Sequence, residues 1–149
     1  MSTVLIATDG SPAARAAVDA GVRLASEQAS DIVFVHAYNE IDVYATPFAP
    51  IVAVPHEVTE AEEDAPLLAA AEVAERAGVM HEERLVAGDT VTTILRVADE
   101  VDAVVIVVGS NRHGTIGTAV LGSVSLELLR RVRRPVLVVH PTPAPVLTG

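Results

Sequence analysis

The sequence contains no lysine, because all ten of its basic residues are arginines. This absence excludes a P-loop, whose lysine contacts phosphates, and it also excludes Schiff-base chemistry and a lysine general base. Cysteine is absent as well. Without it the chain can form no disulfide, no thiolate nucleophile and no thiolate metal site.

Long hydrophobic runs and basic charge are also scarce. No apolar run approaches the roughly 20 residues that a membrane-spanning helix needs, although 50% of the residues are apolar. The N-terminus enters strand-like sequence without the pattern of a signal peptide, so we expect a soluble, cytoplasmic protein. The formal net charge of −10 argues against binding to nucleic acid or to an anionic membrane, but it leaves room for one local phosphate site.

The chain alternates short β-branched runs with segments of helical period. The runs at 3–8 and 103–108 are unbroken, which is typical of parallel strands covered by helices on both faces. Residues 79–86 form a weaker run with polar residues from His81 to Arg84, which suits a sheet edge or a half-exposed position. Their order predicts an α/β fold: a single doubly wound five-stranded parallel sheet with helices on both faces. We expect strands at residues 3–8, 32–37, 79–86, 103–108 and 135–140, and helices over about 12–30, 57–77 and 89–100 and from 123 onward.

The sequence also predicts the domain bounds, one long loop and the buried face of the last helix. Residues 1–140 form one domain, and 141–149, with three prolines, form a flexible tail. Tyr38 to Pro55 has neither helical nor strand period and is interrupted by prolines, so we expect a long loop there. Pro66 is expected to kink or restart its helix. Five residues of the last helix are predicted to face the core: Leu121, Val124, Leu128, Leu129 and Val132.

The stretch from Ala103 to Ser125 organises the chain. An unbroken strand ends at Gly109, a loop rich in glycine and serine follows, and Gly122 stands directly before the last helix. Glycine lets the backbone approach a ligand closely, and the free N–H groups of a first helical turn point outward. The pattern therefore predicts an anion site, with a phosphate as its occupant.

Several common motifs are missing from this chain. The turn after the first strand, Asp9-Gly10-Ser11-Pro12, has one glycine and is no dinucleotide fingerprint, and no hydrolase elbow is present. The five histidines show no zinc-ligand spacing, so no metal site is predicted. Ligands of doubly wound sheets bind beyond the strand carboxyl ends. We expect Thr8-Asp9, His36-Ala37 and Gly109-Ser110 to converge on one crevice there.

These residues resemble the universal stress protein family over residues 3–140. The resemblance rests on Thr8-Asp9, on Gly122-Ser123-Val124-Ser125 and on the closing run from Arg134 to Val139. It implies a Rossmann-like domain of the adenine-nucleotide-binding type. In ATP-binding members the loop reads Gly, two residues, Gly, nine residues, then Gly-Ser or Gly-Thr. Here Gly109, Gly122 and Ser123 keep that spacing, while Arg112 replaces the second glycine and the loop carries Gly114 and Gly117 instead.

The resemblance also implies a ligand, ATP or a related adenine nucleotide with Mg²⁺. Asp9 and the strand end near His36 would hold ribose and adenine, and the glycine loop would hold the phosphates. Arg112 has two readings: its guanidinium pairs with phosphate, or its bulk closes the pocket. The predicted binding residues are Ala7, Thr8, Asp9, His36, Ala37, Val108, Gly109, Asn111, Arg112, Gly122, Ser123, Val124 and Ser125.

Three classes of function are consistent with these residues. The leading hypothesis is a nucleotide-responsive stress protein that acts as a homodimer, with little or no hydrolysis and no catalytic residue. The second is a nucleotide-independent dimeric scaffold of the same family. The third is a phosphohydrolase or nucleotide transferase, for which Asp9 is the sole candidate acid. The homodimer is expected to form through the strand Pro135 to His140, because a sheet edge presents unpaired N–H and C=O groups.

Overall fold

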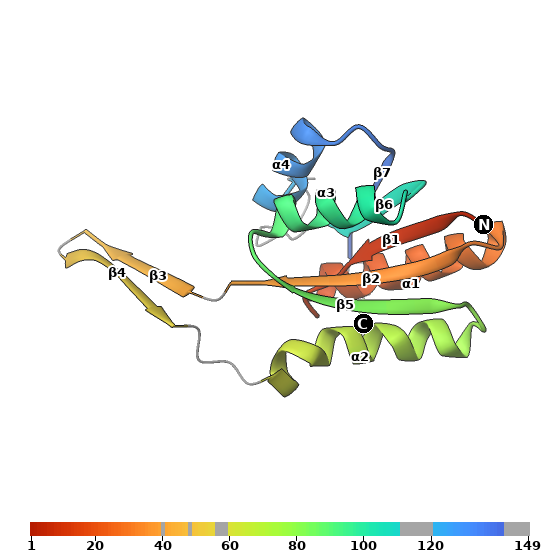
Figure 1. Cartoon of the computed structure of the whole chain (residues 1–149), viewed down its shortest axis with the longest axis horizontal. Coiled ribbons are helices and arrows are strands. Elements are labelled where there is room, and N and C mark those ends of the chain that lie inside the picture. The colour runs from red at the N-terminus through yellow and green to blue at the C-terminus, as the bar shows by residue number, and fades with distance from the viewer. Residues whose placement is uncertain (40, 48, 56–59, 111–120, 142–149) are drawn as a thin grey trace, which may run out of the picture.

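The computed structural model describes residues 1–39, 41–47, 49–55, 60–110 and 121–141. Its main sheet has five strands, all parallel, in the order β5-β2-β1-β6-β7 (Figure 1). This arrangement confirms the predicted fold class. The strands are β1 (Thr3–Ala7), β2 (Asp31–Tyr38), β5 (His81–Ala87), β6 (Val105–Gly109) and β7 (Val136–Val139), and the helices are α1 (Pro12–Gln28), α2 (Glu60–Arg76), α3 (Thr90–Glu100) and α4 (Ser123–Arg131).

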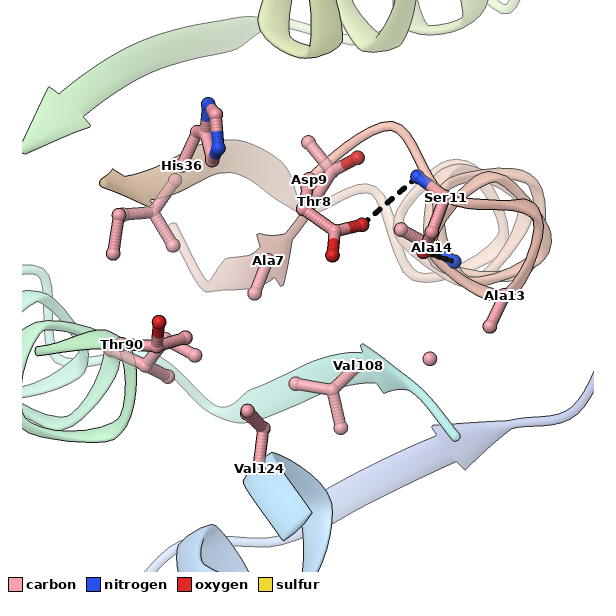
Figure 2. A pocket seen from close by; sticks show the side chains of 14 residues that line it. Ala7, Thr8, Asp9, Ser11, Ala13, Ala14, His36, Thr90, Val108 and Val124 are labelled. Carbon is pink, nitrogen blue, oxygen red and sulfur yellow. Dashed lines mark hydrogen bonds between the residues drawn. The ribbon is translucent and has the colours of Figure 1, made fainter. Parts of the chain in front are cut away.

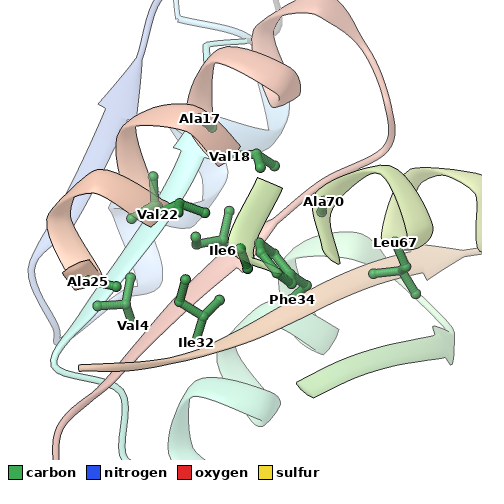
Figure 3. Packing of buried hydrophobic residues seen from close by; sticks show 12 residues of the cluster. Val4, Ile6, Ala17, Val18, Val22, Ala25, Ile32, Phe34, Leu67 and Ala70 are labelled. Atoms are coloured by element: carbon green, nitrogen blue, oxygen red, sulfur yellow. The ribbon is translucent and has the colours of Figure 1, made fainter. Parts of the chain in front are cut away.

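Two helices cover each face of the sheet. Helices α1 and α2 pack on one core cluster and α3 and α4 on another. The alternation of side chains along a strand explains why β1 serves both clusters, since Val4 and Ile6 point to the first and Leu5 to the second. All three are fully buried. Figure 3 shows Phe34 of β2 packed with Ile6 below the two helices of the first cluster.

Local signals place the helix starts. The Ser11 hydroxyl accepts a hydrogen bond from the backbone N–H of Ala14 at 3.2 Å, and Pro12 occupies the first turn of α1. Asp89 caps α3 in the same way, by accepting from the N–H of Thr92 at 2.9 Å. These bonds confirm the predicted starts of both helices. Pro66 lies inside α2, which continues through it.

The winding of the chain reverses at β1. After β1 the chain builds β2 and β5 on one side, and after α3 it crosses to β6 and β7 on the other. β1 is thus the middle strand, β6 is interior, and β5 and β7 are the two edges. The carboxyl ends of β1 and its neighbours β2 and β6 flank the reversal, which is where doubly wound sheets bind ligands.

The predicted long loop between residues 38 and 55 is wrong. That segment contains a second, two-stranded antiparallel sheet formed by β3 (Ile41–Thr46) and β4 (Ala49–Pro55). Its prolines do not prevent pairing, because Pro47 lies in the turn, Pro55 lies at the strand end, and Pro50 lies where the register of the two strands shifts. Figure 1 shows this hairpin extending away from the main sheet. Ile51 and Val52 of β4 are exposed, so these apolar residues do not mark a buried face of a strand.

The predicted inward face of the last helix needs two corrections, because Leu121 lies before α4 and outside the core cluster, and Leu129 is exposed. Leu128 is fully buried, but the side chain of Leu129 is 40% exposed. Adjacent residues of a helix lie about 100° apart around its axis, so these two leucines cannot both face the sheet. Within the described ranges, no helix is long and apolar enough to cross a membrane.

Candidate functional site

A crevice opens at the carboxyl ends of β1, β2 and β6, between the first turns of α1, α3 and α4. Figure 2 shows the side chains that line it. Most are small or apolar, so the crevice suits a largely apolar group with few polar contacts. The lining residues are Ala7, Thr8, Asp9, Ser11, Ala13, Ala14, Val35, His36, Ala37, Thr90, Ile94, Val108, Gly109 and Val124.

The turn from β1 to α1 positions Asp9. One carboxylate oxygen, Oδ1, accepts from the backbone N–H of Ser11 at 2.9 Å, and the Thr8 hydroxyl accepts from Gly10 at 3.2 Å. Gly10 has φ +79°, and a side chain there would meet Pro66 of α2 at 3.3 Å. The turn is therefore held tightly. The second oxygen of the Asp9 carboxylate forms no hydrogen bond with the described residues, so it is open to a ligand.

His36 at the end of β2 is turned toward α2. Its Nδ1 lies 2.9 Å from the backbone oxygen of Glu63 and 3.8 Å from the carboxylate of the same residue. Since a carbonyl oxygen only accepts, Nδ1 donates. The ring is 12% exposed, and Figure 2 shows it pointing toward the helix above the strand. Its side chain thus links the crevice wall to α2.

Gly109 at the end of β6 lies against the first turn of α1. A Cβ atom at this position would be 2.5 Å from the carbonyl carbon of Ala13 and 2.8 Å from the backbone nitrogen of Ala14. Real Cβ atoms do not come so close to backbone atoms, so only glycine fits. The glycine predicted as a phosphate-binding residue is also a packing requirement of the fold.

The start of α4 is attached to the end of β6. The Ser125 hydroxyl donates to the carbonyl of Gly109 at 2.9 Å, and the N–H of Gly122 donates to the carbonyl of Ser110 at 2.8 Å. Gly122 is the N-cap and offers no side-chain cap. The N–H groups of a first helical turn have no partner within the helix. Among the described residues none accepts from those at the start of α4, so they are available to an anion beside Val124, which lines the crevice.

The crevice has little charge of its own. Asp9 is the one charged side chain among its described lining residues, and His36 is the other titratable one. In the part of the chain that the structure describes, no group of three or more His, Asp or Glu side chains could hold a metal ion. Among the described residues, positive potential at this site comes from helix N-termini, because each carries roughly half a positive charge.

The predicted binding residues fall into three groups. Eight line the crevice, and Gly122, Ser123 and Ser125 lie next to it at the start of α4; Asn111 and Arg112 lie outside the described residues. The sequence prediction missed six lining residues, which come from the N-cap and first turn of α1, from β2 and from α3. One signal was available, since every helix that follows a strand begins at the carboxyl edge of the sheet. The missed residues are Ser11, Ala13, Ala14, Val35, Thr90 and Ile94.

Comparison with known proteins identifies the family. Residues 1–140 match the universal stress protein family. The chain belongs to that family. It is 31% identical to universal stress protein Rv1636 of Mycobacterium tuberculosis (strain ATCC 25618 / H37Rv), covering 94% of this chain and 97% of the relative. It is also 34% identical to universal stress protein YxiE of Bacillus subtilis (strain 168), over 92% and 97% of the two chains. The predicted resemblance is confirmed.

A solved universal stress protein in complex with cAMP has the same architecture. It superposes on this chain with a TM-score of 0.68 at 34% sequence identity, covering 95% of this chain and 98% of the other. The universal stress protein fold, with its five-stranded parallel sheet, is thus shared over nearly the whole domain. The cAMP in that structure is a ligand of that protein.

Proposed function

We propose that this universal stress protein binds an adenine nucleotide, ATP or a relative of it, in the crevice at the carboxyl ends of β1, β2 and β6. One observation carries the proposal: an open carboxylate, Asp9, and an uncapped helix N-terminus, that of α4, flank one apolar slot. A nucleotide has hydroxyls, a phosphate and a flat base to match these three features. The cAMP complex of a structure 34% identical supports the same class of ligand.

Each part of the ligand has a matching group. The open oxygen of Asp9 accepts hydrogen bonds from ribose hydroxyls, which is why a carboxylate is suited to that place. The base lies between the end of β2 and the apolar side chains of α3, such as Ile94. The phosphates face the N–H groups at the start of α4, where the helix dipole favours an anion. Mg²⁺ is expected to bind through the phosphates of ATP, since it usually takes few protein ligands.

Arg112 decides how a triphosphate is accommodated. It takes the place of the second motif glycine and lies outside the described residues. If its guanidinium pairs with the phosphates, Arg112→Ala weakens ATP binding; if the side chain closes the pocket, Arg112→Gly strengthens it. We favour pairing, because the described crevice lining supplies no other cation.

The proposed role is binding rather than catalysis. Hydrolysis needs a general base placed beside a water and groups that stabilise charge on the transferred phosphate. The described lining offers Asp9, whose Oδ1 accepts from Ser11, and a histidine whose ring is turned toward α2. The alternative role within the family is a scaffold that needs no nucleotide. A calorimetric trace that stays flat at millimolar ATP would favour that alternative.

Titration calorimetry tests the proposal directly. The protein is titrated with ATP and Mg²⁺, and in a separate run with cAMP. We expect each titration to show a single binding site per subunit. Asp9→Asn keeps the acceptor for the Ser11 N–H but removes the charge offered to ribose, so we expect about tenfold weaker binding or more, the value of a charged hydrogen bond. Asp19→Asn on α1 is the matched control, since that exposed carboxylate does not line the crevice. Equal affinity for both variants would contradict the role of Asp9.

We further propose a homodimer through the C-terminal strand, residues Pro135 to His140. β7 is an edge strand of the sheet. The carbonyl of Val139 accepts from the N–H of Ser110 at 2.9 Å, so Val139 faces β6. Its neighbour Val138 then directs its N–H and C=O to the open edge. Antiparallel pairing with the same strand of a second copy would satisfy both edges about a two-fold axis.

A further inference from the structure

Thr90 is a crevice residue whose hydroxyl has no partner among the described residues. It is the first residue of α3, it is partly buried, and it lines the crevice. Its hydroxyl forms no hydrogen bond with any described residue. Capping does not explain its presence, because Asp89 beside it already caps α3 through the Thr92 N–H. The hydroxyl is thus free for another purpose.

The position of Thr90 is well determined by its surroundings. The N–H of Gly88 donates to the carbonyl of Tyr38 at 2.8 Å, which ties the turn before α3 to the end of β2. Gly88 has φ +141°, a conformation that L side chains rarely adopt. The Asp89 carbonyl accepts from the Thr93 N–H at 2.9 Å and so starts the helix. Together these bonds hold Thr90 at a constant place relative to β2.

The hydroxyl faces the part of the crevice next to β2. Figure 2 shows the Thr90 oxygen directed toward the space between α3 and the strand end that carries His36. The neighbouring crevice walls are apolar, formed by Val35, Ala37 and Ile94. A polar ligand atom brought there loses water on most sides. Its hydrogen bond with the hydroxyl then decides whether it binds well, because an unpaired buried polar group is costly.

We propose that Thr90 is a specificity-determining residue, whose hydroxyl accepts a hydrogen bond from the 6-amino group of the adenine ring. The assignment rests on the proposed nucleotide site and deepens it by naming the atom that selects the base. The base is the part of the ligand that enters the apolar end near β2, since Asp9 and the start of α4 attract ribose and phosphate. A threonine hydroxyl has two acceptor lone pairs for such an amino group.

A double-mutant cycle tests the assignment. Wild type and Thr90→Val are titrated with ATP and with purine riboside triphosphate, which lacks the 6-amino group, both in excess Mg²⁺. Valine has nearly the shape of threonine but no hydroxyl. We expect wild type to prefer ATP by about three- to tenfold, the value of one neutral hydrogen bond, and Thr90→Val to bind the two ligands equally. Thr90→Ser, which keeps the hydroxyl, should restore the preference.

The outcomes separate the two proposals. If wild type binds ATP but Thr90→Val keeps the full preference for the 6-amino group, the assignment of Thr90 is wrong while the nucleotide site stands. If wild type binds neither ligand, the proposed function is wrong and the assignment with it. A loss of affinity for both ligands by the same factor, with an unchanged melting temperature, would show that Thr90 only shapes the crevice and would also overturn the assignment.

Discussion

Gly109→Ala gives a direct test of how β6 and α1 are packed. The new methyl group would lie 2.5 Å from the carbonyl carbon and 2.6 Å from the carbonyl oxygen of Ala13. Carbon atoms in van der Waals contact are about 3.5–4.0 Å apart. The atoms in the way belong to the backbone, so no rotamer change can relieve the clash. The first turn of α1 must therefore move away from β6 by about 1 Å.

The free-energy cost follows from what that movement disturbs. Helix α1 buries Ala17 and Val18 in the first core cluster, where β6 contributes Val107. Overpacking a core costs about 1–3 kcal/mol, and a backbone clash belongs at the upper end, so we expect about 3 kcal/mol lower free energy of unfolding. For a domain of this size each kcal/mol corresponds to about 2–4 °C, which predicts a melting temperature lower by about 6–12 °C.

Urea unfolding followed by circular dichroism measures the effect, with Gly78→Ala as the control. Gly78 has φ +68° and no atom within 4 Å of its would-be Cβ, so its substitution costs only backbone strain, about 1–2 kcal/mol. Gly109 has no positive φ, and its cost is steric alone. If Gly109→Ala unfolds at the wild-type urea midpoint, the packing argument is refuted. If Gly109→Ala keeps the wild-type urea midpoint but loses nucleotide binding, Gly109 is required for the ligand and not for packing.

Two further predictions concern α3 and the β7 edge. The backbone N–H of Thr92 lowers the pKa of the Asp89 carboxyl, so the cap contributes stability above the unfolded pKa of about 3.9 and loses it as pH falls through the lower folded pKa. Asp89→Ala should thus lower the free energy of unfolding by about 1 kcal/mol at pH 7, measured by urea titration. The difference in this free energy between variant and wild type should shrink below about pH 4, and a difference that stays constant with pH would contradict the prediction. Val138→Pro should convert a dimer to a monomer in light scattering after size exclusion, since it removes an N–H at the open edge; a wild-type mass near that of one chain would disprove the dimer.

The sequence by itself determined the main sheet, because its strands and helix starts depend on signals within each segment. Residues 105–108 of β6 are all β-branched, and such a run is typical of a parallel strand covered on both faces. Ser11 and Asp89 cap their helices through bonds that span three residues. The order of these segments then allows few topologies. The carboxyl edge of the sheet was therefore identifiable as the site before any contact was known.

Only the tertiary structure decided which side chains meet at that edge and what each one does. The Ser125 hydroxyl, predicted to hold phosphate, donates to the Gly109 carbonyl, and the His36 ring is turned to Glu63 of α2. The Thr90 hydroxyl, which has no partner among the described residues, lines the crevice from α3, and no residue of that helix was predicted to belong to the site. Such contacts join residues far apart in the chain. They depend on the distances between packed layers, which local periodicity, capping and glycine spacing do not encode.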